Sequence, residues 1–150
     1  MRTSRNLSAW VMAGLLLAAL SGPAGGQEVS EHGNPWVTVT IGKVTVQAEA
    51  VLTPERLYLG LSNRTELPEG RGMLFFMPAQ EVQTFCMRGM RIPLDLIWIR
   101  DGRVAGLSRN VPSTFPGNLS STEPVSHVLE VPGGFADRHG IKAGDRVRWQ

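Results

Sequence analysis

Cysteine is almost absent from this 150-residue sequence, which contains a single one, Cys86. One thiol cannot form an internal disulfide, so the fold must depend on its hydrophobic core for stability. A chain of this length has room for one domain, and such a domain buries enough apolar surface to stand without cross-links.

Long hydrophobic runs are missing as well. The main apolar run, residues 9–20, has 12 residues, whereas a membrane-spanning helix needs about 20. This run follows Arg2 and Arg5 and precedes the small-residue segment 21–26, which is the order found in a secretory signal peptide. We therefore predict cleavage after Gly26, export to the periplasm or the medium, and no stable membrane span after cleavage. Retention of the run as an anchor is the alternative.

The sequence also has no cluster of basic residues. It contains 15 Lys and Arg against 13 Asp and Glu, and removal of residues 1–26 takes away Arg2 and Arg5, which leaves 13 of each sign. The mature protein is therefore formally neutral. Binding to a phosphate backbone requires a concentrated basic face. We therefore expect no nucleic acid among its partners.

The common catalytic and metal-binding motifs are not found either. The three histidines, at positions 32, 127 and 139, are far apart and show no metal-ligand spacing. There is no Gly-x-Ser-x-Gly nucleophile motif, and Gly133-Gly134 lacks the lysine and the spacing of a phosphate loop. The sequence therefore assigns no cofactor, no metal and no catalytic residue, and it leaves enzymatic activity undecided.

Alternating apolar and polar residues provide the strongest structural signal. Val37, Val39 and Ile41 alternate with threonines, and a second alternating segment begins at Val44. The intervening Gly42-Lys43 is typical of a type II′ hairpin turn, and Asp101-Gly102 is typical of a type I′ turn. The sequence thus predicts two hairpins.

The remaining segments complete a mainly β architecture. Further strands are expected at 72–77, 82–88, 92–100, 103–107, 125–131 and 146–149. Short helices are expected after Thr53-Pro54 and between Gly134 and Gly140. Residues 27–35 form a flexible leader and residues 108–124 a long loop in this prediction. We expect residues 36–150 to form a single-domain β-sandwich or irregular barrel of about seven or eight short strands with one or two short helices.

Several motifs occur in an order that resembles a known family. These are Gly60-Leu61 with Arg64 and Leu67-Pro68, then Gly72–Phe75, Phe85–Asp95, Val128–Glu130 with Gly134, and Gly140 with Gly144-Asp145. Over about residues 44–147 the chain resembles the bacterial and archaeal family called domain of unknown function 192. The resemblance implies a compact, mostly β fold and implies no activity.

Four positions depart from the pattern of that family. Ser62 stands where methionine is usual, Cys86 replaces tryptophan, and Gly89 replaces asparagine. Arg56 sits one place earlier than the Glu-Arg pair of the family would put it. If this central part of the sequence lines a site, the site is altered in this chain.

Asp95 is the polar residue that most needs an explanation. It lies between Ile92-Pro93-Leu94 and an apolar run, and burial of a carboxylate without partners is costly. We expect contact with Arg88 or Arg64, or capping by backbone N–H groups, with Glu130 as a second acid nearby. The group could be an internal structural contact, or it could grip a small ligand. The candidate ligand-binding residues are Arg64, Arg88, Asp95 and Glu130.

Three functions agree with these features. The first is an exported binding or accessory module of the cell envelope that recognises a small molecule, a polysaccharide or an envelope protein. The second is a hydrolase or lyase that uses Asp95 and Glu130. The third is copper binding by soft sulfur ligands, although methionines on apolar strands usually fill core gaps. The sulfur-containing residues are Met73, Met77, Cys86, Met87 and Met90.

Overall fold

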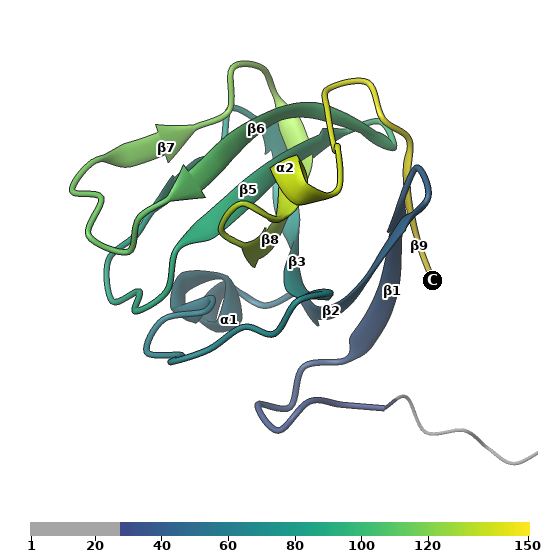
Figure 1. Ribbon diagram of the computed structural model, residues 1–150. Helices are drawn as coiled ribbons and strands as arrows, with labels where there is room; N and C mark the ends of the chain where they lie inside the picture. Colours follow the sequence, from purple (N-terminus) through teal and green to yellow (C-terminus); the bar gives the residue numbers. More distant parts are fainter. Residues whose placement is uncertain (1–27) are drawn as a thin grey trace, which may run out of the picture.

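The computed structural model describes residues 28–150, so the predicted signal peptide lies outside the described residues (Figure 1). Its strands are β1 (Trp36–Ile41), β2 (Val44–Val51), β3 (Arg71–Glu81), β4 (Thr84–Cys86), β5 (Leu94–Arg100), β6 (Arg103–Val111), β7 (Asn118–Ser120), β8 (Val125–Pro132) and β9 (Val147–Trp149). The helices are α1 (Pro54–Leu59) and α2 (Phe135–Arg138). Neither helix has the length and apolar character that a membrane span requires.

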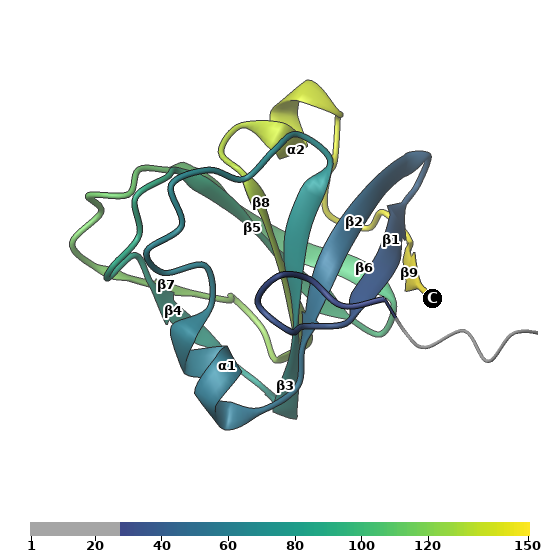
Figure 2. The same ribbon diagram turned by 90° about the horizontal axis from the view of Figure 1, so that it is seen from below.

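Seven strands form one sheet in the order β6-β5-β8-β3-β2-β1-β9, and β4 pairs with β7 in a second, small sheet. Neighbours in the large sheet are antiparallel except β2 and β3, which are parallel. The sheet curls until its two edges meet at one end, where Val104 N–H donates to the Asp145 carbonyl (2.9 Å) and Val147 N–H to that of Gly102 (2.8 Å). The result is a half-barrel, which Figure 2 shows from below. The expected mainly β fold is confirmed. Of the two expected architectures, a β-sandwich and an irregular barrel, the observed half-barrel is closer to the irregular barrel.

Both expected hairpins are present. In the first, Ile41 lies opposite Val44 and Val39 opposite Val46. Gly42 has a φ of 58°, as the first turn position of a type II′ hairpin requires. In the second, Asp101 and Gly102 both have positive φ, 49° and 68°, which is the type I′ geometry.

Two apolar clusters lie on opposite faces of the large sheet. The inner core, on the concave face, comprises Val39, Ile41, Val46, Ala48, Leu74, Ile97, Ile99, Val104, Leu129, Val131, Phe135, Ala136, Ile141 and Val147. The outer core comprises Val51, Leu61, Met73, Phe75, Met87, Leu94, Leu96, Trp98, Val111, Val125 and Val128. Successive residues of a strand point to opposite faces, so central strands buried on both faces read as continuous apolar runs.

Some boundaries differ from the sequence prediction. The expected loop 108–124 contains the end of β6 and all of β7, whose Leu119 pairs with Phe85 of β4. The polar residues of this segment occupy exposed edge positions, so they gave no alternating signal. Strand β3 continues through Pro78, because the register shift between Phe76 and Glu81 leaves the proline outside the regular ladder. Helix α1 ends at Leu59, before Gly60 with a φ of 50°.

The segment before β1 is packed against the sheet. Residues 28–35, expected as a flexible leader, form a turn closed by a bridge between Val29 and Pro35. The side chains of Ser30 and Asn34 are buried and donate hydrogen bonds to Glu49 Oε2 at 2.9 and 2.7 Å. A buried carboxylate on β2 therefore orders this segment.

Candidate functional site

Asp95 is a buried cap for backbone groups. Its neighbours Leu94 and Leu96 belong to the outer core, so its own side chain points to the other face of the sheet, toward α2. The carboxylate has no exposed surface and accepts hydrogen bonds from the N–H groups of Asn110, Gly134 (2.9 Å) and Ala136 (2.7 Å). The structure shows the capping by backbone N–H groups, which was one of the two expected environments. The other, a contact with Arg88 or Arg64, is not present at this carboxylate.

Arg64 forms a buried ion pair with a different acid. Its Nη1 and Nη2 atoms contact Glu49 Oε1 at 2.6 Å and Oε2 at 3.0 Å. Burial alone would raise the pKa of Glu49, but hydrogen bonds from Arg64, Asn34 and Ser30 outweigh it and hold that pKa below its usual value. Arg64 therefore ties the segment after α1 to strand β2.

Asp95 and Glu130 lie on opposite faces of the sheet. Asp95 pairs across the ladder with Val131, and Glu130 pairs with Leu96. Residues directly opposite each other share a face and successive residues alternate, so the two carboxyl groups cannot meet in one cleft. This geometry contradicts the alternative of a hydrolase or lyase in which Asp95 and Glu130 act together.

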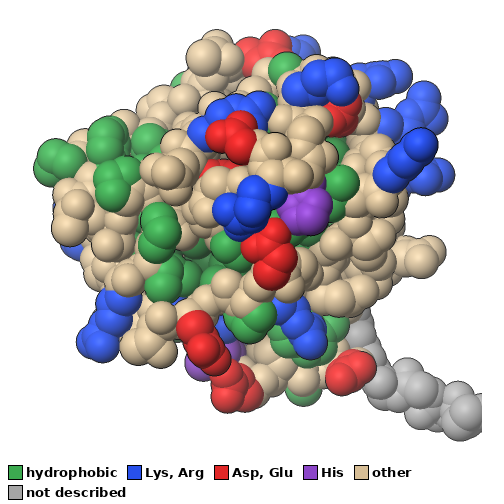
Figure 3. All heavy atoms as spheres, in the orientation of Figure 1, with side chains coloured by type: hydrophobic (Ala, Val, Ile, Leu, Met, Phe, Trp, Pro, Cys, Tyr) green, Lys and Arg blue, Asp and Glu red, His purple; other side chains and the backbone are tan. Residues whose placement is uncertain are grey.

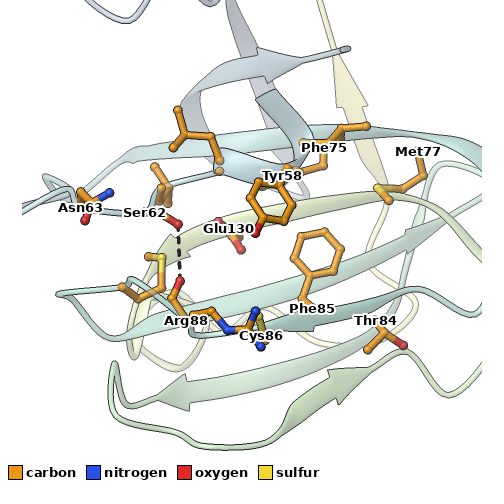
Figure 4. Close-up of a pocket in the computed structure, with 15 residues that line it drawn as sticks. Tyr58, Ser62, Asn63, Phe75, Met77, Thr84, Phe85, Cys86, Arg88 and Glu130 are labelled. Carbon is orange, nitrogen blue, oxygen red and sulfur yellow. Dashed lines mark hydrogen bonds between the residues drawn. The ribbon is translucent and has the colours of Figure 1, made fainter. Parts of the chain in front are cut away.

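Two of the four candidates, Arg88 and Glu130, line the same pocket (Figure 4). It lies between α1 with the following turn and β4 with the segment after it, and it has a volume of about 450 Å³. Small-molecule sites commonly have volumes of about 300–1,000 Å³. The pocket is lined by Leu57, Tyr58, Leu59, Gly60, Leu61, Ser62, Asn63, Phe75, Met77, Thr84, Phe85, Cys86, Arg88, Met90 and Glu130.

Glu130 places a buried carboxyl group in the wall of this pocket. Its ladder partners Met73 and Leu96 are fully buried, and its own side chain is almost completely buried. Within residues 28–150, Oε2 has no hydrogen-bond partner. Burial raises the pKa of Glu130 to about 8, so the group is mostly a neutral carboxylic acid at pH 7.

An unpaired buried polar atom is uncommon in folded proteins, and each one calls for an explanation. Leaving such an atom without a partner costs about 1–3 kcal/mol. Glu130 lines the pocket, so a ligand that reaches its carboxyl group is a candidate for the missing partner of Oε2.

Two of the four departures from the family pattern, Ser62 and Cys86, line this pocket, and Ser62 Oγ donates to the Arg88 carbonyl at 3.5 Å. Gly89 lies between the lining residues Arg88 and Met90, and a Cβ atom there would be 3.4 Å from the Ser62 Cβ atom. Arg56 does not line the pocket. Serine and cysteine are smaller than the methionine and tryptophan usual at positions 62 and 86, so this part of the lining is less bulky in this chain.

The sulfur-containing residues are divided between core and pocket. Met73 and Met87 are buried in the outer core, whereas Met77, Cys86 and Met90 line the pocket. Figure 4 shows the ring of Phe85 between Met77 and Cys86. No group of three or more His, Cys, Asp and Glu residues within 28–150 could hold a metal ion.

Several residues of the site were not singled out from the sequence. Tyr58, Phe75 and Phe85 line the pocket, but an aromatic residue in an apolar segment looks the same whether it fills a core or borders a cavity. The sequence did contain a signal for Glu49, the partner of Arg64. It is an acidic residue between Ala48 and Ala50 at an otherwise apolar strand end.

The chain is similar to proteins of known structure. A crystal structure of a protein of unknown function from Novosphingobium aromaticivorans DSM 12444 is 35% identical, with a TM-score of 0.79 over 84% of this chain and 94% of that one. A second, described as a "putative transcription regulator" from Sinorhizobium meliloti 1021, is 27% identical, with a TM-score of 0.72 over 81% of this chain and 97% of that one.

None of the curated proteins compared with the chain matches it. The model of the family described as uncharacterized ACR, domain of unknown function 192, matches residues 37–149. This range includes both sheets, both helices and the whole pocket. The chain therefore belongs to the domain of unknown function 192 family.

Proposed function

We propose that this protein is an exported binding module of the cell envelope that holds a small ligand in the pocket between α1 and β4. The observation that carries the proposal is Glu130, which lines an open pocket and whose buried Oε2 atom has no hydrogen-bond partner among residues 28–150. A ligand with a complementary polar group would satisfy this atom and gain the hydrogen bond in a desolvated setting.

The rest of the lining supports a binding role. The lining combines apolar side chains such as Leu57 and Phe85 with polar ones such as Asn63 and Arg88, and small-ligand sites likewise use polar groups to fix the orientation of the ligand. Asp95 and Arg64, the other two candidates, have structural partners of their own. The binding interpretation therefore rests on Glu130 and Arg88.

Export is supported by the order of residues 1–26, with two arginines, an apolar run and a small-residue segment. A tagged full-length chain expressed in a Gram-negative host should appear in the periplasm or the medium with Gln27 as its N-terminus. Recovery of a cytosolic chain that retains Met1 would contradict this part of the proposal.

Binding is tested with purified residues 27–150 and a mixed collection of carboxylates, amines, amides and short oligosaccharides. Ligands of this pocket should raise the melting temperature of the wild-type protein. They should lose this effect in Cys86→Trp, which fills the pocket with the residue usual in the family.

Val82→Trp is the matched control, because Val82 is exposed and does not line the pocket. If no compound distinguishes Cys86→Trp from Val82→Trp, the pocket is not the binding site. Oligosaccharides that stabilise both variants equally would instead indicate a surface site for polysaccharide.

A further inference from the structure

The pocket is more polar on one side than on the other. Figure 4 shows Asn63, Ser62 and Arg88 toward one side, Glu130 near the middle, and Met77 with the ring of Phe85 toward the other side, where Thr84 is the polar residue. A uniformly apolar ligand would leave the polar side unsatisfied, and a uniformly polar one would lose contact with the rings. The arrangement therefore selects a ligand that is itself amphipathic.

The polar side carries net positive charge. Arg88 is exposed and forms no ion pair with any acid among residues 28–150. Tyr58, Cys86 and Glu130 are the other titratable groups of the lining. Since Glu130 is mostly neutral at pH 7, the guanidinium of Arg88 is the dominant charge, and it favours an anion.

We propose that the pocket binds a short amphipathic carboxylate, with its head between the Arg88 guanidinium and the Glu130 carboxyl group and its apolar chain along Met77 and Phe85. Arginine is well suited to this head group because it can donate two parallel hydrogen bonds to one carboxylate. The protonated Glu130 donates its O–H to the same head. This inference rests on the proposed function, and it specifies the chemical class of the ligand.

Three probes with the same eight-carbon chain test the head group: octanoate, octanol and octylammonium, each titrated into residues 27–150 by calorimetry at pH 7. Octanoate should bind about tenfold more tightly than octanol, as expected for charge-assisted hydrogen bonds. Octylammonium should bind more weakly than both, because Arg88 repels it.

Two variants test whether Arg88 is responsible for the preference for octanoate over octanol. Arg88→Gln should reduce the affinity for octanoate to that for octanol, while Arg91→Gln should leave it unchanged, since Arg91 is exposed and outside the pocket. Circular dichroism of each variant verifies that the fold is retained before its affinity is interpreted.

The role of Glu130 is tested by pH. In the wild-type protein the affinity for octanoate should fall severalfold between pH 7 and 9, because the ionised carboxylate would repel the ligand. Glu130→Gln keeps a donor that does not titrate, so its affinity should stay constant. Glu81→Gln, an exposed site outside the pocket, should behave like the wild type.

Two results would overturn the inference. If octanol or octylammonium binds as tightly as octanoate, the pocket binds ligands but does not select an anionic head, and the proposed function survives. If none of the three probes binds at millimolar concentration, the amphipathic class is wrong, and the broader collection of compounds decides the proposed function independently.

Discussion

Asp95 and Glu130 are buried carboxyl groups on neighbouring strands, yet their hydrogen-bonding surroundings differ. Asp95 accepts three backbone N–H groups, two of them at the start of α2. Glu130 is flanked by Met73 and Leu96, so burial dominates and the neutral form is favoured. Asp95 therefore stabilises the fold, whereas Glu130 remains available to a ligand.

Replacing Asp95 should destabilise the protein strongly. Asp95→Ala leaves the N–H groups of Asn110, Gly134 and Ala136 without their acceptor. At about 1–3 kcal/mol for each buried unsatisfied group, we expect the free energy of unfolding to fall by at least about 3 kcal/mol. Urea denaturation measures this change.

Arg88→Ala is the informative comparison for Asp95. Arg88 is exposed, so its replacement should change the free energy of unfolding by less than about 0.5 kcal/mol. A loss in Arg88→Ala equal to that in Asp95→Ala would show that the two residues form an ion pair and would contradict the capping arrangement.

Glu130 should make stability fall with increasing pH. Its pKa is near 4.5 when exposed and about 8 in the fold, so the folded state binds more protons between these values. The stabilising contribution is complete below pH 4.5 and is lost as the pH rises to about 8. Between pH 7 and 9 the free energy of unfolding should decrease by about 1.4 kcal/mol.

Glu130→Gln should remove this pH dependence, and thermal melts at pH 7, 8 and 9 would show it. Burial lowers the pKa of His127, so His127 affects stability only below about pH 6.5 and does not contribute in this window. If Glu130→Gln and the wild type lose equal stability between pH 7 and 9, the carboxyl group is already ionised at pH 7.

At the level of elements, the start of β3 depends on close approach of neighbouring backbones. Gly72 lies in β3 next to β2 and β8, and a Cβ atom at this position would be 2.6 Å from the Glu130 carbonyl oxygen. Val46 and Val131 would be 3.1 and 3.2 Å away. Gly72 therefore allows β3 to approach the strand that carries Glu130.

Gly72→Ala should consequently be destabilising. Because the backbone must shift to admit the methyl group, we expect a loss of about 1–3 kcal/mol in the free energy of unfolding. Gly106→Ala is the matched control, since its Cβ would meet only Trp98 Cδ1 at 3.7 Å. Equal effects of the two substitutions in chemical denaturation would show that the close contact at Gly72 is not important.

The sequence predicted elements well where local chemistry determines them. The two hairpins depend on Gly42 and Asp101-Gly102, and their turn geometry follows from residues that accept positive φ. Strand β7 was missed because its pairing with β4 joins segments far apart in the chain, and no local pattern reveals such a partner. The pocket was only half predicted for the same reason, since α1 and β4 meet through tertiary packing.

At the level of the whole molecule, several basic side chains are paired with acids. On the face that Figure 3 shows, acidic side chains stand beside Lys and Arg side chains near the centre, while further Lys and Arg side chains gather at the upper right. Ion pairs join Arg109 to Asp137 at 2.6 Å and Arg138 to Glu69 at 2.8 Å. Such pairing reduces the positive potential that a phosphate backbone would meet.

The charge balance predicts that residues 27–150 do not bind nucleic acid. With 13 basic and 13 acidic residues after removal of residues 1–26, binding would release few counterions and would gain little free energy from them. Residues 27–150 at micromolar concentration should therefore not shift a 30-base-pair DNA or a 30-nucleotide RNA in a gel at 50 mM salt. A complex at 50 mM salt that weakens steeply by 200 mM salt would contradict the prediction. It would show that one face of the protein is basic enough to bind phosphates despite the neutral total charge.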